Sequence, residues 1–85
     1  MADYMVYITK TAQKQLDKLP DRAAESLLDA IQSLAKDPRP AGCKKLKGRD
    51  GYRVRNGDYR IIYDVLDKML IVEVIALGHR KNIYP

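Results

Sequence analysis

Apolar residues recur along this chain with two different periods, and the change of period separates predicted helices from predicted strands. Tyr, Val and Ile crowd into residues 4–8, a composition typical of a strand. From a start at Thr9 or Thr11, apolar residues return at positions i, i+4 and i+7, which places them on one face of a helix. Pro20 ends that helix, so the sequence predicts a first strand followed at once by a short helix.

A longer apolar stripe over residues 24–35 predicts a second helix. Asp21 is suited to cap its N-terminus, and the pair Asp37-Pro38 stops it. Residues 38–51 then lose all periodicity and gather Pro, Gly and several cations. This composition predicts a basic loop.

Strand-like sequence returns after the loop. Residues 52–55 and 59–66 read as strands joined across Asn56-Gly57, a pair that favours the positive φ values of a type I′ hairpin turn. A further turn leads into residues 70–77, an almost wholly apolar run of the kind expected for an interior strand. The sequence therefore predicts three consecutive strands joined by tight turns.

The predicted order of elements is strand, helix, helix and three strands, closed by a short polar tail over residues 78–85. This order is typical of an α+β fold in which two helices pack on one face of a small, mostly antiparallel sheet. A chain of 85 residues has room for one core, so residues 1–85 are expected to form a single domain. The sheet face opposite the helices is left free for function.

The charge balance narrows the class of partner. The chain carries 16 Lys and Arg against 11 Asp and Glu, a net charge of +5, and its pI is about 9.4. Nucleic acids and acidic proteins are the natural partners of such a chain, ahead of an anionic membrane. The N-terminus has no apolar segment of the signal-peptide type, and no run approaches the ~18 apolar residues of a membrane span. We expect a soluble, cytoplasmic protein with no membrane partner.

The sequence has no cluster of Cys, His or carboxylate residues at the spacing of a metal or cofactor site. Cys43 has no second cysteine to pair with, and one Cys with one His rules out an ordinary Cys/His zinc site. The carboxylates Asp64, Asp67 and Glu73 are scattered over turns and strands at spacings that suggest no shared face. We expect no metal and no cofactor, so any nuclease activity would be metal-free.

Arginines on the predicted hairpin are the best clue to function. Alternate residues of a strand share a face, so Arg53 and Arg55 point the same way, and a tight hairpin places Arg60 beside them. Guanidinium groups bind phosphate well, and like charges that face one another destabilise a sheet, so an anionic ligand explains the cluster. The alternative is a solvated outer face with Asp58 and Asp64 as local partners.

Three residues near the C-terminus are candidates for acid–base chemistry. His79 and Arg80 are expected just past the last strand, where strand ends deliver side chains to the rim of the sheet, and His79 can exchange a proton near neutral pH. Tyr84 can donate or accept a hydrogen bond or stack on a base, or simply hold the tail against the core. A metal-free ribonuclease needs a base for the RNA 2′-hydroxyl, cations for the charged phosphorane and an acid for the leaving oxygen, and these residue types can supply them.

The basic loop is a weaker signal of the same kind. Its cations are candidates for contacts with the RNA backbone, although lysine-rich loops are commonly just solvated: Lys44, Lys45, Lys47 and Arg49. Binding through such contacts would weaken steeply with salt, because each contact releases counterions from the nucleic acid.

Four segments together resemble the RelE branch of the RelE/ParE toxins of bacterial and archaeal toxin–antitoxin systems, and the resemblance covers almost the whole chain. The segments are Leu46-Lys47-Gly48, Tyr52-Arg53-Val54-Arg55, Gly57-Asp58-Tyr59-Arg60-Ile61-Ile62-Tyr63 and Gly78-His79-Arg80-Lys81-Asn82-Ile83-Tyr84. The resemblance implies a ribosome-dependent endoribonuclease that cuts messenger RNA in the ribosomal A site and inhibits translation.

Site residues follow from the resemblance by position. It implies that Arg60 and Arg80 support the scissile phosphate and that Tyr84 lies near the nucleophile. Arg53 and Arg55 stand where well-studied members have lysines, and arginine is a poor general base because its pKa lies above ~12. The role of the base then shifts to Tyr84 or His79, or is lost.

The resemblance also implies partners and competing functions. A RelB-like antitoxin would cover the basic face with an amphipathic helix or an added strand. The toxin would meet 16S and 23S rRNA on the ribosome, and operator DNA only through the antitoxin. One alternative is a ParE-like inhibitor of DNA gyrase, but the short first helix and Tyr84 favour the RelE branch. The other alternative is a non-catalytic basic RNA-binding module.

Overall fold

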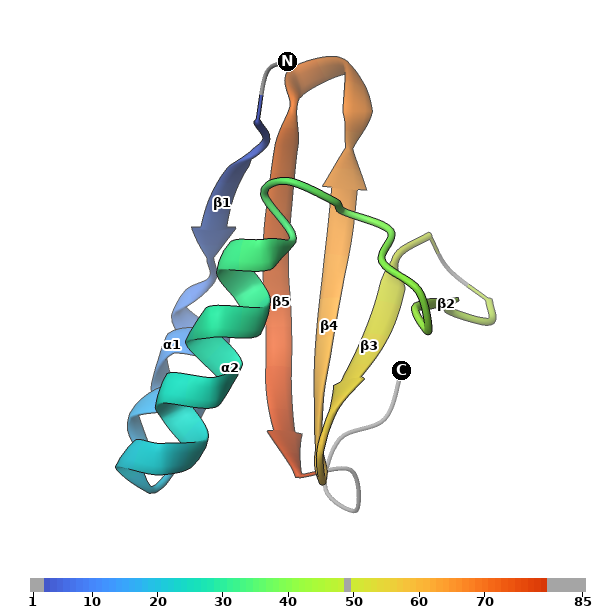
Figure 1. The fold of residues 1–85 in the computed structure, drawn as a ribbon. Coiled ribbons are helices and arrows are strands. Elements are labelled where there is room, and N and C mark those ends of the chain that lie inside the picture. The colour runs from blue at the N-terminus through green and yellow to red at the C-terminus, as the bar shows by residue number, and fades with distance from the viewer. Residues whose placement is uncertain (1–2, 49, 80–85) are drawn as a thin grey trace.

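A single five-stranded mixed sheet forms the centre of the protein, with two helices packed on one of its faces (Figure 1). The computed structural model describes residues 3–48 and 50–79. The elements along the chain are β1 (Met5–Ile8), α1 (Lys10–Asp17), α2 (Asp21–Ser33), β2 (Lys44–Lys45), β3 (Tyr52–Asn56), β4 (Tyr59–Leu66), η1 (Asp67–Met69) and β5 (Ile71–His79). The strands lie in the order β1-β5-β4-β3-β2, and β1 runs parallel to β5 while the other pairs are antiparallel. The predicted α+β class is confirmed.

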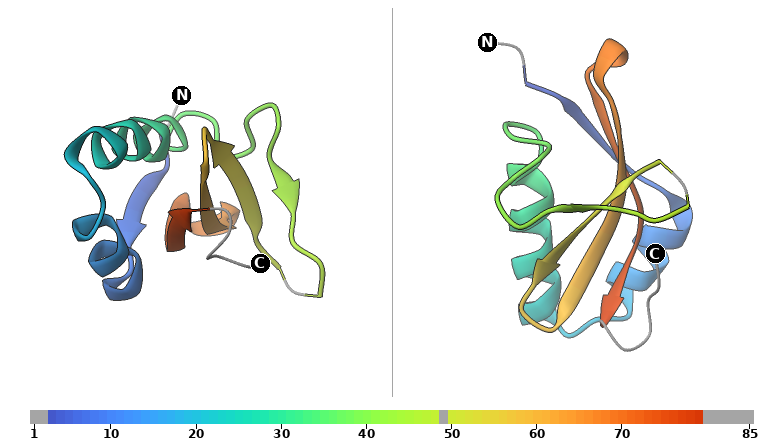
Figure 2. Two further views of the ribbon diagram at one scale, coloured as in Figure 1. Left: turned by 90° about the horizontal axis from the view of Figure 1, so that it is seen from below. Right: turned by 90° about the vertical axis from the view of Figure 1, so that its right-hand side faces the viewer.

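The main core lies between the helices and the sheet, at the β1 end of the sheet, whereas β2 forms the opposite edge (Figure 2). Its fully buried members come from both helices and the two central strands: Ala12, Leu16, Leu27, Ile31, Leu34, Ile61, Tyr63, Val72, Val74 and Leu77. Tyr52 and Val54 pack against the same core. The faces of β3 therefore divide as the sequence predicts, with Arg53 and Arg55 turned away from the helices.

Both helices form where their apolar stripes predict them, but they begin differently. Thr9 caps α1, because its hydroxyl accepts a hydrogen bond from the amide of Ala12 over 3.1 Å. The prediction that Asp21 caps α2 is wrong: Pro20 holds the cap position, and Asp21 is the first residue of the helix. The carboxylate of Asp21 lies in the first turn, where it interacts favourably with the positive end of the helix dipole. None of the helices in residues 3–48 and 50–79 is long and apolar enough to cross a membrane.

The hairpin between β3 and β4 has a different turn from the one expected. Asn56 pairs with Tyr59, so the two central residues of the turn are Gly57 and Asp58, not Asn56 and Gly57. Positive φ is found at Gly57, at +63°, and not at Asp58. A type I′ turn needs positive φ at both central residues, whereas type II′ needs it only at the first. The turn therefore has the φ signs of type II′. Its two-residue length fixes the register of β3 against β4.

A β-bulge in β5 changes which side chains face the helices. Ile62 on β4 pairs with Ala76 on β5, but its neighbour Tyr63 pairs with Val74. Ile75 is therefore an extra residue, and two successive side chains of β5 turn to the same side of the sheet. The alternation along β5 is shifted by one beyond this point, so His79 faces the helices.

Side chains from the start of the helical layer satisfy the backbone around the bulge. The Thr9 hydroxyl donates to the carbonyl of Ile75 over 3.0 Å, and the Thr9 amide donates to the carbonyl of Val74, also over 3.0 Å. The Gln15 side chain accepts from the amide of Leu77 over 2.8 Å. Because buried backbone groups must be paired, these bonds fix the bulge and the position of α1 together.

The face of the sheet away from the helices, here called the outer face, has a small apolar cluster of its own. Leu46 and Ile62 are buried there, with Ile75 and Ala76 packed against them. Leu46 follows β2, a short strand that lies within the predicted basic loop and was missed in the sequence. The loop is thus tied to the sheet edge, which gives its lysines defined positions.

The segment between α2 and β2 is anchored at its start by a buried tyrosine. Tyr63 has no exposed surface and donates its hydroxyl to the carbonyl of Pro38 over 2.8 Å. Burial raises the pKa of this hydroxyl above its ordinary value, so the phenol stays protonated and keeps donating.

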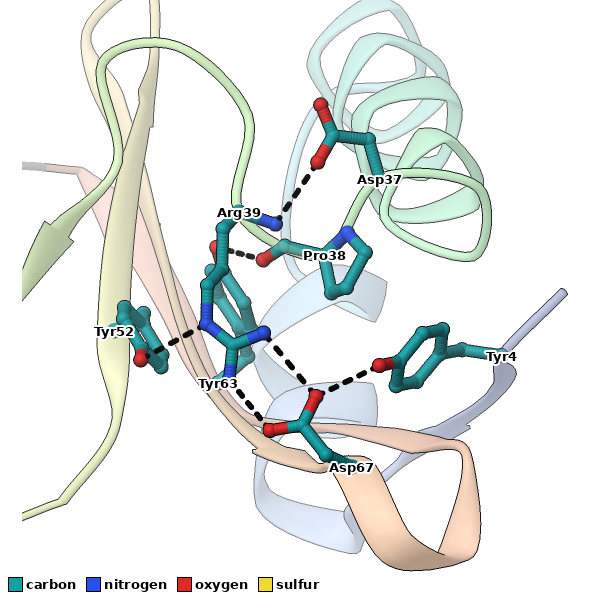
Figure 3. Close-up of polar contacts among 7 residues, drawn as sticks. All are labelled: Tyr4, Asp37, Pro38, Arg39, Tyr52, Tyr63 and Asp67. Carbon is teal, nitrogen blue, oxygen red and sulfur yellow. Dashed lines mark hydrogen bonds and ion pairs between the residues drawn. The ribbon is translucent and has the colours of Figure 1, made fainter.

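Arg39 joins that segment to two other parts of the chain (Figure 3). Its guanidinium makes a bidentate ion pair with Asp67 at 2.7 and 3.1 Å, and its Nε donates to the hydroxyl of Tyr52 over 3.0 Å. Tyr4 donates to the same carboxylate over 2.7 Å. One surface network therefore connects the N-terminal strand, the segment after α2, β3 and the turn before β5.

This network makes stability depend on acid pH. Hydrogen bonds from Arg39, and then from Tyr4, lower the pKa of Asp67 to about 2, from an ordinary value of about 3.9. The stabilisation is complete above the ordinary pKa and is lost as the pH falls towards 2, because the unfolded chain then binds a proton first. In urea unfolding at a series of pH values, we expect the stability difference between wild type and Asp67→Asn to shrink from about pH 5 to pH 2. Arg39→Gln should remove the same pH dependence. A difference that stays constant over this range would contradict the role of the pair.

Candidate functional site

Two pairs of cations face one another across neighbouring strands of the outer face. Arg55 on β3 lies directly opposite Arg60 on β4, and Arg53 lies directly opposite Lys44 on β2. Residues paired in this way share a face of the sheet, and positions two apart on one strand share it too. We call these pairs the Arg55/Arg60 row and the Lys44/Arg53 row.

The two rows enclose one pocket. It has a volume of about 160 Å³ and is lined by Gly42 together with all four cations. Within the described part of the chain, no carboxylate lines it. The Nε of Arg60 is buried and has no hydrogen-bond partner among the described residues. A buried donor without a partner is costly, so an acceptor from outside the described residues would be favourable at Arg60.

The acidic neighbours considered in the sequence do not fill this role. Asp58 lies in the hairpin turn and lines a different pocket beside α2. The carboxylate of Asp64 lies near Gly51, farther along β4, and lines another cavity with Arg39. Arg55 and Arg60 are therefore facing like charges in a pocket that no carboxylate of the described residues lines, which suits an anion such as phosphate.

Facing like charges should carry a measurable cost in the free protein. Replacing Arg55 by Gln removes the repulsion with Arg60 and should raise the free energy of unfolding by about 0.2–1 kcal/mol at low salt. Arg55→Lys keeps the charge and should show no such gain. Urea unfolding at low and high salt measures both, and the gain from Arg55→Gln should shrink as salt screens the pair. Equal stability of the two variants would contradict the repulsion.

The lysines of the basic loop divide between different surfaces. Lys44 belongs to the pocket, and Lys47 lines a second, larger cavity of about 440 Å³ with Lys44 and Arg53. Lys45 pairs with Tyr52, so it lies on the opposite side of β2 from Lys44, although it also borders that second cavity. Among the remaining predicted site residues, Arg49, Arg80 and Tyr84 lie outside the described residues.

His79 lies apart from the arginines. The sequence predicts it beyond the last strand, but it is the final residue of β5. It pairs with Tyr59 and packs edge-on against that ring, with the centroids 5.7 Å apart. Gln15 and Leu19 line the same cavity, so this end of β5 faces the helical layer. The bulge at Ile75 is the physical reason, because it shifts the alternation of β5 by one residue.

The sequence predicts the cluster of arginines but not the positions of all the residues around it. Alternation along a strand and the tight hairpin were enough to bring Arg53, Arg55 and Arg60 together, and the structure confirms that all three line one pocket. Lys44 was included only as a loop cation, because a two-residue strand leaves no periodic signal. The network around Arg39 was also missed, since its partner Asp67 is far away in sequence.

Comparison with known proteins agrees with this topology and this basic face. The family model described as the ParE toxin of the type II toxin–antitoxin system, parDE, matches residues 6–84. Toxin RelG of Mycobacterium tuberculosis is 31% identical over 83 residues, which cover 95% of each chain. The mRNA interferase toxin RelE of Escherichia coli is 31% identical over 82 residues, 93% of this chain and 85% of that protein.

A solved structure gives the same result for the fold. The toxin–antitoxin complex RelBE2 of Mycobacterium tuberculosis contains a chain that matches with a TM-score of 0.81 and 29% identity, over 92% of this chain and 99% of that one. The fold and the paired cations thus define a small cationic toxin domain of α+β topology. The chain belongs to the RelE/ParE superfamily of type II toxin–antitoxin toxins, and within it to the RelE branch.

Proposed function

We propose that this toxin is a ribosome-dependent, metal-independent endoribonuclease that cuts messenger RNA in the ribosomal A site. The observation that carries the proposal is the pocket lined by the two cation rows, one of which includes Arg60, whose buried Nε has no acceptor among the described residues. A scissile phosphate supplies such an acceptor and gains most when its charge rises in the transition state. The similarity to a relative named an mRNA interferase supports RNA as the substrate.

The proposed reaction uses the substrate's own hydroxyl. The 2′-oxygen bonds to phosphorus as the bond to the 5′-oxygen breaks, which leaves a 2′,3′-cyclic phosphate and a 5′-hydroxyl. A base takes the proton of the 2′-hydroxyl, and an acid gives one to the leaving oxygen. Arg60 and, by the family resemblance, Arg80 stabilise the charge on the phosphorane, while Arg53 and Arg55 hold the RNA backbone.

Tyr84 is our candidate for the proton transfer at the 2′-hydroxyl. Arginines are poor bases, so Arg53 and Arg55 cannot take over the role of the lysines found at these positions in well-studied members. His79 packs against Tyr59 on the helix side of the sheet, away from the pocket. This separation favours Tyr84, which the resemblance assigns to the site.

We further propose that a RelB-like antitoxin neutralises the toxin by covering its basic face. The similar structure from Mycobacterium tuberculosis is a toxin–antitoxin complex, which supports this kind of partner. An acidic antitoxin complements a net charge of +5. Contacts with messenger RNA, 16S rRNA and 23S rRNA would use the same cations, and contact with operator DNA would require the antitoxin. We place the protein in the cytoplasm, where these partners are found.

Mapping of messenger ends in growing cells tests the proposal. Induction of the toxin in bacteria should arrest growth and produce new messenger 5′ ends at fixed positions within codons, detected by primer extension. A strain with Arg80→Ala and Tyr84→Phe should lose these ends. Arrested growth with intact messages would contradict the proposal.

A gyrase inhibitor is the second candidate. The family model that matches this chain is described as the ParE toxin, and the ParE branch of the superfamily inhibits DNA gyrase. This function predicts an SOS response in vivo and loss of supercoiling by purified gyrase, with messages left intact. Gyrase that works normally in the presence of the purified toxin would exclude it.

A further inference from the structure

The two cation rows are stacked along the outer face at a fixed spacing. The Arg55/Arg60 row and the Lys44/Arg53 row are joined through β3, where Arg53 and Arg55 are two residues apart. Two residues of a strand span about 6.6 Å, and the two pairs are also offset sideways by one strand spacing of about 4.8 Å, so their centres lie about 8 Å apart. This spacing is comparable to the separation of the two phosphates that flank one sugar in a single RNA strand.

Each row has its own reason to bind an anion. A pair of facing like charges is unfavourable in a sheet, and here this unfavourable pairing occurs twice in succession. No carboxylate of the described residues lines the pocket between the rows. Ile62 lies opposite Arg53 and is buried in the outer-face cluster, so the Lys44/Arg53 row lies beside well-packed apolar side chains. A single phosphate at Arg60 would leave the repulsion between Lys44 and Arg53 uncompensated.

We propose that the outer face has two phosphate subsites one nucleotide apart. The Arg55/Arg60 row takes the scissile phosphate, and the Lys44/Arg53 row takes the neighbouring phosphate of the same strand. The proposal rests on the proposed function for the identity of the scissile phosphate, but the binding itself needs no cleavage. Lys44 is then a positioning residue, which holds the strand so that the scissile phosphate meets Arg60.

Spacing can be separated from charge with three small ligands. Adenosine 3′,5′-bisphosphate has two phosphates on either side of one sugar, ADP has two adjacent phosphates, and AMP has one. Calorimetric titration of the purified toxin should show the bisphosphate binding about tenfold more tightly than ADP, because only the bisphosphate reaches both rows. Equal affinity for the bisphosphate and ADP would overturn the proposal.

A matched pair of variants locates the second subsite. Lys44→Ala should weaken bisphosphate binding about tenfold and bring it close to that of ADP. Lys14→Ala removes the same charge from α1, on the helical side of the sheet, so it should have a much smaller effect. Equal losses in the two variants, for all three ligands, would show general electrostatic attraction and overturn the proposal.

Backbone amide shifts of the unmodified toxin give an independent readout. The amides of Lys44 and Arg53 should move with the bisphosphate more than with AMP, and unchanged shifts there would count against the second subsite. The two proposals fail separately. A toxin that prefers the bisphosphate but leaves messages intact contradicts only the ribonuclease. One that cuts messages without this preference contradicts only the two subsites.

Discussion

Replacing Arg60 by alanine should lower messenger cleavage by about 10²–10³-fold, the range found when one preorganised donor to a developing negative charge is removed. Arg60 lines the pocket of the two cation rows, and its Nε has no hydrogen-bond partner among the described residues, so the guanidinium has donor capacity left for a phosphate. The loss should appear in the rate of cleavage on purified ribosomes under single-turnover conditions. The affinity for the ribosome should change much less, because the surface lysines remain.

Arg22→Ala is the matched control for this substitution. Arg22 lies on α2, lines a pocket between that helix and the hairpin turn, and is not part of the pocket of the two cation rows. Its removal changes the net charge by the same amount, so a charge effect on RNA binding would appear in both variants. If Arg22→Ala and Arg60→Ala slow cleavage equally, Arg60 has no special place in the site.

Replacing Gly51 by alanine should destabilise the fold by about 3 kcal/mol, through both backbone strain and crowding. Its φ of +128° lies in a region that residues with a side chain rarely adopt. An added Cβ would lie 2.7 Å from a carboxylate oxygen of Asp64, 3.2 Å from Leu46 and 3.3 Å from the carbonyl of Tyr63. The aspartate can move away, but the backbone carbonyl cannot. In a domain of this size we expect the melting temperature to fall by more than about 10 °C.

Gly57→Ala separates the two causes. Gly57 also has positive φ, +63°, but nothing lies within 4 Å of an added Cβ there. Alanine at this position should cost about 1–2 kcal/mol, through the strain of positive φ alone. Equal losses at Gly51 and Gly57 in thermal unfolding would show that crowding beneath β4 contributes nothing.

The sequence predicts those parts of the fold that depend on local periodicity. The stripe that includes Leu27 and Ile31 is enough to place α2, and β4 has the predicted limits because β-branched and aromatic residues fill it up to the next turn. The tight hairpin was also predictable, although the central residues of its turn were assigned one position too early. Pairing of Asn56 with Tyr59 is decided by the cross-strand register, which local turn preference does not determine.

The features that sequence could not predict arise from contacts between distant segments. The bulge at Ile75 has no local signature, and it depends on bonds from Thr9 and Gln15 on the helical side. It nevertheless decides the face on which His79 lies. In the same way, β2 exists because Lys44 and Lys45 pair with β3, and this pairing turns a loop lysine into a member of the pocket.

Cleavage on purified ribosomes tests whether the pocket of paired cations cuts messenger RNA held in the A site. The most direct measurement uses purified ribosomes with a defined codon in the A site, the purified toxin, and the same messenger free in solution as a control. We expect one cut within the A-site codon, a 2′,3′-cyclic phosphate at the new 3′ end, and an uncut free messenger. If the same toxin arrests growth in cells but leaves the A-site codon intact on purified ribosomes, the proposed ribonuclease activity is contradicted.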